Sequence, residues 1–201
     1  MLFYVGVYKI LLKSVLKGLL HMQSVSFKIN AIENGWFEAE FGTISRRAAI
    51  SASGKWGNDA ARHLIHFTNK LLSGKISSGY VSFDEAPGTY ILFIDNCNDT
   101  TQLYVLYSQL ETRYWKGLHT YGTIALSDFL NIIPVKEVLL FAEIDLKHFA
   151  NSIYREFDVF TDKKHLSSYE YNWNMFPVKE FHKLESLTQE HTYPHFIFIT
   201  A

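Results

Sequence analysis

An Asn-Gly pair between two apolar runs constrains the fold of this chain more than any other feature. Asn34-Gly35 follows an alternating run and precedes a second one, Trp36 to Phe41. Both central residues of a type I′ turn need positive φ, which asparagine and glycine tolerate best. The pair therefore predicts a β-hairpin at the start of an antiparallel sheet. The alternating apolar residues of the first run are Val25, Phe27 and Ile29.

Turn and cap signals divide the rest of the chain into further elements. A helix is expected between a cap at Asn58 or Asp59 and a stop at Gly74. Pro87-Gly88 favours a tight turn in a second hairpin, because proline presets φ for a turn. The other expected elements are strands in 43–53, 101–109 and 136–146, and helices in 145–160 and 177–187.

This order of elements indicates the fold class. Early hairpins and late helices predict an α+β fold, an antiparallel sheet built from hairpins with helices packed on one face. A length of 201 residues suits one domain whose core needs no disulfide or metal. The single cysteine, Cys97, excludes an intramolecular disulfide and a zinc site of paired cysteines. The stretch 111–134 has no clean period, and 196–200 is either a strand or a tail.

The first 21 residues differ from the rest of the chain. Lys9, Lys13 and Lys17 recur every fourth position in an apolar background, which predicts a basic amphipathic helix. The uncharged run before them is far shorter than the roughly 18 residues of a membrane span, and a secretory signal places its charges first. We expect an extension over 1–21 and a single α+β domain over 22–201. The extension packs on the domain, precedes a natural start at Met22, or binds an anionic membrane surface.

The charge balance argues against nucleic acid as a partner. The chain has 19 Lys and Arg against 20 Asp and Glu, and without the three N-terminal lysines the body carries 16 against 20. A nucleic-acid binder normally has a basic stripe, and the sequence shows none. A phosphate loop, a serine-hydrolase elbow and a dinucleotide fingerprint are also missing from the sequence, so no cofactor is expected.

Two sets of residues could carry chemistry. Asp84 and Glu85 are adjacent acids at the mouth of the second hairpin, but neighbouring strand residues point to opposite faces, so convergence is not expected. We expect Asp84 to bind turn amides instead. His63 and His66 are three apart on the expected helix, with Asp59 as a third candidate metal ligand. We interpret this trio as a solvated helix face and expect no metal.

An aromatic segment precedes the last helix. Tyr171 and Trp173 belong to it, and exposed aromatic residues of this kind mark protein interfaces. Burial in the core is the competing interpretation, since most aromatic side chains are largely buried. The sequence leaves both interpretations open.

Several of these motifs occur in one order: "WGNDAARHL", "FDEAPGTY" and "YEYNWNMFPVKEFHKL" after the first hairpin. In this order the chain resembles small bacterial proteins of unassigned function, over residues 24 to 188. The resemblance implies a body that begins near Met22, and it brings no catalytic residue with it. Small acidic α+β proteins without catalytic motifs are similar in kind to immunity proteins that neutralise bacterial toxins.

The leading hypothesis is a cytoplasmic, non-catalytic module that binds a protein partner such as a toxin domain. Its acidic body would complement a basic target and speed the encounter. The expected contact residues are Asp84, Glu85, Tyr171 and Trp173. One alternative is an enzyme with an unrecognised site built from His63, His66, Asp59 and Asp84. The other is a peripheral membrane protein bound through residues 1–21, and the oligomeric state stays open.

Overall fold

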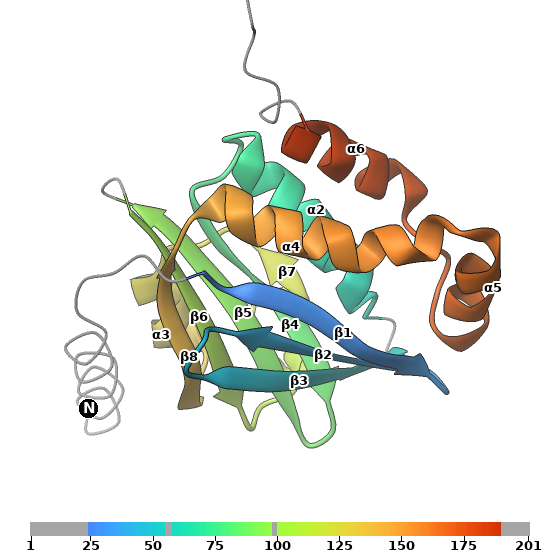
Figure 1. Ribbon diagram of the computed structural model, residues 1–201. Helices are drawn as coiled ribbons and strands as arrows, with labels where there is room; N and C mark the ends of the chain where they lie inside the picture. Colours follow the sequence, from blue (N-terminus) through green and yellow to red (C-terminus); the bar gives the residue numbers. More distant parts are fainter. Residues whose placement is uncertain (1–23, 55–57, 98–99, 190–201) are drawn as a thin grey trace, which may run out of the picture.

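Two antiparallel sheets and five helices make up the part of the chain that the computed structural model describes, residues 24–54, 58–97 and 100–189 (Figure 1). The three-stranded sheet has the order β1 (Ser26–Glu33), β2 (Trp36–Gly42), β3 (Arg47–Ser53). The five-stranded sheet has the order β7 (Tyr121–Gly122), β4 (Ser78–Glu85), β5 (Gly88–Cys97), β6 (Thr100–Ser108), β8 (Val135–Ile144). The extension expected over 1–21 and the ending 196–200 lie outside the described residues.

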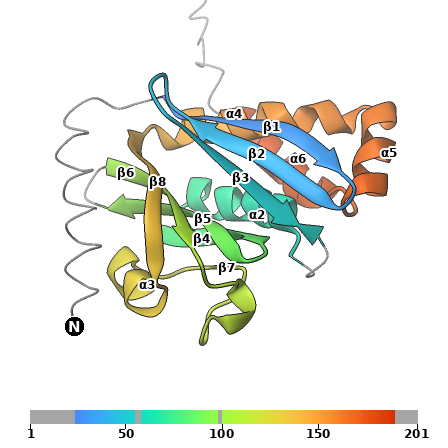
Figure 2. The same cartoon turned by 90° about the horizontal axis from the view of Figure 1, so that it is seen from below.

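Helices lie on both sides of the five-stranded sheet. They are α2 (Ala60–Leu72), α3 (Leu126–Ile132), α4 (Leu146–Asp158), α5 (Lys163–Asn172) and α6 (Val178–Gln189), with 3₁₀ turns η2 (Thr112–Tyr114) and η3 (Val159–Thr161). The predicted α+β class with hairpin-built antiparallel sheets is confirmed, although the strands form two sheets instead of one. Figure 2 shows α3 on the other side of the five-stranded sheet from α4 and α6. No helix in the described ranges is long and apolar enough to cross a membrane.

The first hairpin forms as predicted. Asn34 and Gly35 have φ values of 53° and 78°, the positive values that a type I′ turn requires. The register around the turn pairs Glu33 with Trp36, so the loop has two residues. The second hairpin also has a two-residue turn, Ala86 and Pro87, joined by a cis peptide, and Glu85 pairs with Gly88.

The five-stranded sheet is buried on both faces, which explains the unbroken apolar runs of its central strands. On β5, Leu92 and Ile94 belong to the larger core between the two sheets and α2. Their neighbours Ile91 and Phe93 belong to a second, smaller core under α3. Because alternate residues of a strand point to opposite faces, burial of both faces requires apolar residues at every position.

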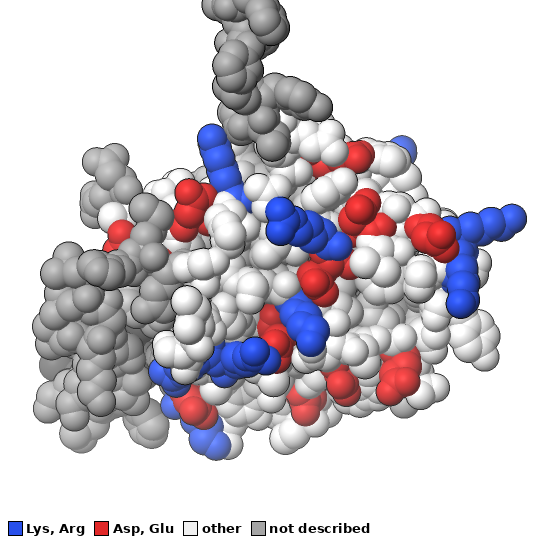
Figure 3. Space-filling model, viewed as in Figure 1, with Lys and Arg blue, Asp and Glu red and all other residues white. Residues whose placement is uncertain are grey.

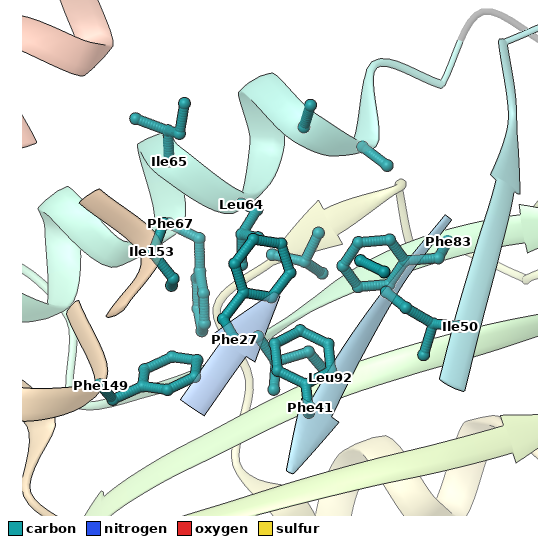
Figure 4. Packing of buried hydrophobic residues seen from close by; sticks show 14 of the residues in the cluster. Phe27, Phe41, Ile50, Leu64, Ile65, Phe67, Phe83, Leu92, Phe149 and Ile153 are labelled. Carbon is teal, nitrogen blue, oxygen red and sulfur yellow. The ribbon is translucent and has the colours of Figure 1, made fainter. Parts of the chain in front are cut away.

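Aromatic rings join the two sheets to the helices. The ring of Phe41 on β2 lies 5.2 Å from that of Phe27 on β1 and 6.2 Å from that of Phe83 on β4, centroid to centroid. The ring of Phe149 on α4 lies 6.1 Å away on another side (Figure 4). Phe41 therefore contacts both sheets and a helix within one fully buried cluster.

Helix α4 closes the free edge of β1, along which it runs (Figure 1). The backbone N–H of Phe27 donates to Oγ of Ser152 over 3.0 Å, and that of Ile29 donates to Oε2 of Glu156 over 2.8 Å. The two acceptors are four residues apart, so they lie on one side of the helix. An unpaired strand edge is a template for association with another chain, and these side chains occupy its donors.

Truncation of Phe41 tests the joint between the sheets. We expect Phe41→Ala to lower the free energy of unfolding by about 3–5 kcal/mol, because it leaves a cavity where both sheets and α4 meet. Urea unfolding followed by circular dichroism measures the change. Glu38→Ala, an exposed position on the same strand, is the control and should change stability by less than about 0.5 kcal/mol. Equal effects at the two positions would contradict this role.

Loss of Glu156 tests the closed edge of β1. Glu156→Ala should cost about 1–3 kcal/mol, because the Ile29 N–H loses its acceptor. It should also cause concentration-dependent self-association, measured by size-exclusion chromatography with light scattering. Glu156→Gln retains an acceptor oxygen and should restore most of the stability. An alanine variant as stable and monodisperse as Arg155→Ala, the neighbouring exposed control, would show that the edge needs no cover.

Candidate functional site

A pocket of about 410 Å³ lies at the turn end of the β4–β5 hairpin, beside the segment that leads into β7. Its walls combine apolar side chains, above all the buried Trp115, with carboxylates and hydroxyls. This mixture is typical of binding pockets, in which a few polar groups set the orientation of a ligand. The lining residues are Asp84, Glu85, Ala86, Glu111, Thr112, Arg113, Trp115, Leu118, His119 and Thr120.

Asp84 is the buried acid of this pocket, with 5% of its surface exposed. Its carboxylate accepts hydrogen bonds from Thr89 Oγ1 at 3.0 Å, from Thr112 Oγ1 at 2.5 Å and from Asn58 Nδ2 at 3.1 Å. The donors expected from the sequence are turn amides, whereas the observed donors are side chains. The difference arises because η2 and the residue before Asp59 fold over the hairpin, which no local pattern indicates.

The charges of the pocket do not balance. Glu111 forms an ion pair with Arg113, at 2.9 Å and 3.0 Å through its two oxygens. Glu85 accepts a hydrogen bond from Ser51 on β3. Neither Asp84 nor Glu85 takes part in an ion pair within the described ranges. The donors on Asp84 are neutral, so the pocket keeps an excess of negative charge.

Both adjacent acids line the same pocket, although we did not expect them to converge. Glu85 is the last residue of β4, where the chain leaves the regular alternation of the strand. Its carboxylate bonds to the three-stranded sheet, whereas that of Asp84 bonds to the start of α2 and to η2. The two carboxyl groups therefore share the pocket and have separate partners.

A hydrogen-bonded connection leads from Asp84 to His63. The fully buried Asn58 donates from Nδ2 to Asp84 and to the Ser82 carbonyl, each at 3.1 Å. Its Oδ1 is therefore the acceptor for Nδ1–H of His63, at 3.1 Å. Thr120 Oγ1 lies 3.3 Å from the same ring nitrogen. In a catalytic triad one ring nitrogen of the histidine bonds to the orienting group and the other bonds to the nucleophilic hydroxyl. Asn58 and Thr120 both lie at Nδ1 of His63, so these contacts do not form such a triad.

The candidate metal ligands have other contacts. Asp59 caps α2 by accepting from Arg62 N at 3.2 Å, and the same oxygen accepts from Trp173 Nε1 at 3.1 Å. His63 and His66 are half-buried because Tyr121 packs against them, with ring centroids 4.6 Å and 5.6 Å away. Within the described ranges no three His, Cys, Asp or Glu residues are placed to hold a metal ion.

The two aromatic candidates differ in their surroundings, and neither lines the pocket. Tyr171, near the end of α5, has 90% of its surface exposed. Trp173 is half-buried, with its ring 5.7 Å from that of Phe37 and its Nε1 bonded to Asp59. Of the four expected contact residues, the pocket joins Asp84 and Glu85 alone.

Sequence reasoning missed most of the pocket wall. Glu111, Arg113, Trp115 and His119 come from the stretch with no clean period. Its concentration of charged and aromatic residues between two strands was the available signal, because binding residues often lie in connections held by a rigid scaffold.

The burial of His63 predicts how stability depends on pH. Burial lowers the pKa of its imidazole, although the Asp59 carboxylate acts in the opposite direction. The unfolded chain then binds the proton more strongly, so the free energy of unfolding falls as the pH drops through 6.5, the ordinary value. His63→Gln keeps an N–H for Asn58 and should lose less stability than wild type between about pH 8 and about pH 5.5.

Urea unfolding at both pH values measures this difference. Burial also lowers the pKa of His66, so His66→Gln should remove a separate part of the pH dependence, and the double variant should remove both parts. A His63→Gln protein that keeps the full pH dependence of the wild type would contradict the assignment.

Comparisons of the chain with protein-family models, with curated proteins and with solved structures find no match. The resemblance drawn from motif order remains a prediction. A functional proposal for this protein therefore rests on the geometry of the pocket and its neighbours.

Proposed function

We propose that the protein is a non-catalytic binding module whose pocket holds a basic side chain of a protein partner. The observation that carries the proposal is Asp84, a buried carboxylate with neutral donors that lines an accessible pocket. Charges attract more strongly where water is scarce, so a lysine or arginine gains most at such a place. Glu85 adds a second negative charge beside it.

The apolar wall fits the same class of ligand. Long basic side chains lay their methylene stems on apolar surface while the charged end meets its partner. Trp115 and Leu118 offer such surface in the pocket, and Thr112 and Thr120 offer hydroxyls. An arginine guanidinium also has the donors to bond two carboxylates at once.

A basic protein, such as a toxin domain neutralised in the cytoplasm, is the partner class that this chemistry supports best. Negative potential at a recess speeds encounter with a basic surface and discourages acidic partners. On the face shown in Figure 3, acidic and basic side chains are interspersed over α4, α5 and β1, and neither sign forms a broad field. Recognition through a discrete pocket is compatible with such a surface.

Selection from a random peptide display library against the immobilised full chain tests the proposal. We expect enrichment of peptides with a lysine or arginine beside apolar residues. Glu85→Gln keeps the acceptor for Ser51 and removes a charge, so it should weaken binding of a selected peptide about 3- to 10-fold. Fluorescence anisotropy with labelled peptide measures the affinity.

The matched control for this test is Glu143→Gln. Glu143 is exposed on β8 and pairs with Gln102, which pairs with Asp95, at the opposite end of the sheet from the pocket. Its substitution should leave peptide affinity unchanged. Enriched peptides without basic residues, or equal losses in the two variants, would refute the proposal.

A further inference from the structure

A second charged surface lies beside the pocket, on the outer side of α2. Arg62, His66 and Lys70 follow one another at intervals of four residues, which places them in one row along the helix. Glu180 on α6 bonds to Arg62 and to Asn69 of α2. Lys183 follows Glu180 by three residues, so it lies on the side of α6 that faces this row. Its charge also contributes to lowering the pKa of His66. We call these four residues the α2 ladder.

The contacts of the α2 ladder leave positive charge at its far end. Glu180 on α6 accepts from Arg62 Nε at 3.0 Å and from Nη2 at 2.9 Å, so Arg62 is paired. No ion pair within the described ranges includes Lys70 or Lys183. The Lys70 Nζ lies 5.5 Å from the centre of the Tyr121 ring, which holds it beside β7. The excess positive charge therefore lies around His66.

The pKa of His66 responds to this arrangement. Burial lowers it, Lys70, Lys183 and Arg62 lower it further, and Glu180 acts in the opposite direction. Tyr121 is the ring that packs against His66 from β7. An added anion would counter the lysines and raise this pKa, so His66 is a built-in reporter for a negative group at the α2 ladder.

Two adjacent residues, Thr120 and Tyr121, connect the pocket with the α2 ladder. Thr120 lines the pocket and contacts His63 at 3.3 Å. The next residue, Tyr121, contacts His63, His66 and Lys70. From His63 to Lys70 the helix rises by about 10 Å, at about 1.5 Å per residue. A partner segment that extends from the pocket along Tyr121 would therefore come within reach of Lys70.

We infer that the partner places an acidic side chain against Lys70 and Lys183, roughly 10–15 Å from the basic side chain in the pocket. This inference rests on the proposed function and adds a charge order to it. In an extended segment the two charged residues would be about three or four positions apart, at about 3.3 Å per residue. A negative surface beside a positive one attracts such a segment when it binds in one direction. In the opposite chain direction like charges would face each other, and binding would be weaker.

A spacing series tests the inference. A selected basic peptide is made with one glutamate two, four or six positions from its basic residue, on either side, and each is compared with its glutamine twin. We expect glutamate to tighten binding about threefold or more at a spacing near four, on one side only. The measurement is fluorescence anisotropy against the full chain.

Variants then locate the effect. Lys70→Gln with Lys183→Gln should abolish the gain from glutamate and leave the affinity of the glutamine twin unchanged. Lys28→Gln with Lys164→Gln, exposed positions on β1 and α5, is the control pair and should keep the gain. Proton NMR of His66 should show its pKa rise with the glutamate peptide and not with the twin.

The outcomes separate the two proposals. The inference is overturned if each glutamate peptide binds no more tightly than its glutamine twin, or if the gain from glutamate survives the loss of both lysines. Peptide binding that depends on Glu85 would in that case still support the pocket. Peptides that show no dependence on their basic residue or on Glu85 would overturn the pocket and the inference together.

Discussion

The carboxylate of Asp84 lies where four separate segments meet, and the candidate site depends on its hydrogen bonds. It belongs to β4 and accepts from Asn58 before α2, from Thr89 on β5 and from Thr112 in η2. A buried carboxylate needs hydrogen-bond donors to replace its lost hydration, so the three donors must be held in place. The wall of the pocket, the start of α2 and the orientation of His63 all depend on this one group.

The sheet that carries Asp84 imposes a second constraint. Its faces are both apolar, and α2 and the three-stranded sheet cover one of them. The other is covered by α3 and the connection before it, through Trp115 and Phe129. The residues of that connection are placed by the shape of the sheet that they cover. Their apolar side chains therefore do not recur with the period of a helix or a strand. The connection contributes both the second core and the pocket wall with Glu111 and Arg113.

Local signals explain which parts of the fold could be predicted. Asn34-Gly35, the Asp59 cap and the apolar stripe of α4 act over a few residues, and each element formed where it was expected. Helix α5 has one buried residue, Tyr169, and no strong apolar stripe. Its apolar residues therefore do not recur with the period of a helix, and no signal in the sequence indicated it.

The division into two sheets and the pocket depend on contacts between distant residues. The Asn58–Asp84 hydrogen bond joins positions 26 apart, and Thr112–Asp84 joins positions 28 apart. The sequence spacing of these residues does not indicate that they bond to each other, because the packing of whole elements brings them together. The adjacent acids could be noticed in the sequence, whereas the donors that give Asp84 its environment could not.

The exposed ion pairs contribute little to the stability of the fold. Arg47–Glu40, Arg62–Glu180 and Arg113–Glu111 each have an arginine side chain at least half exposed. Exposed pairs of this kind add roughly 0–1 kcal/mol each to stability. The cores supply most of the folding free energy, so the exposed charges around the pocket and on the α2 ladder, unlike the buried Asp84, are not needed to hold the fold. Their placement on neighbouring parts of the surface, with opposite signs, supports the proposed recognition of a partner with the complementary order of charges.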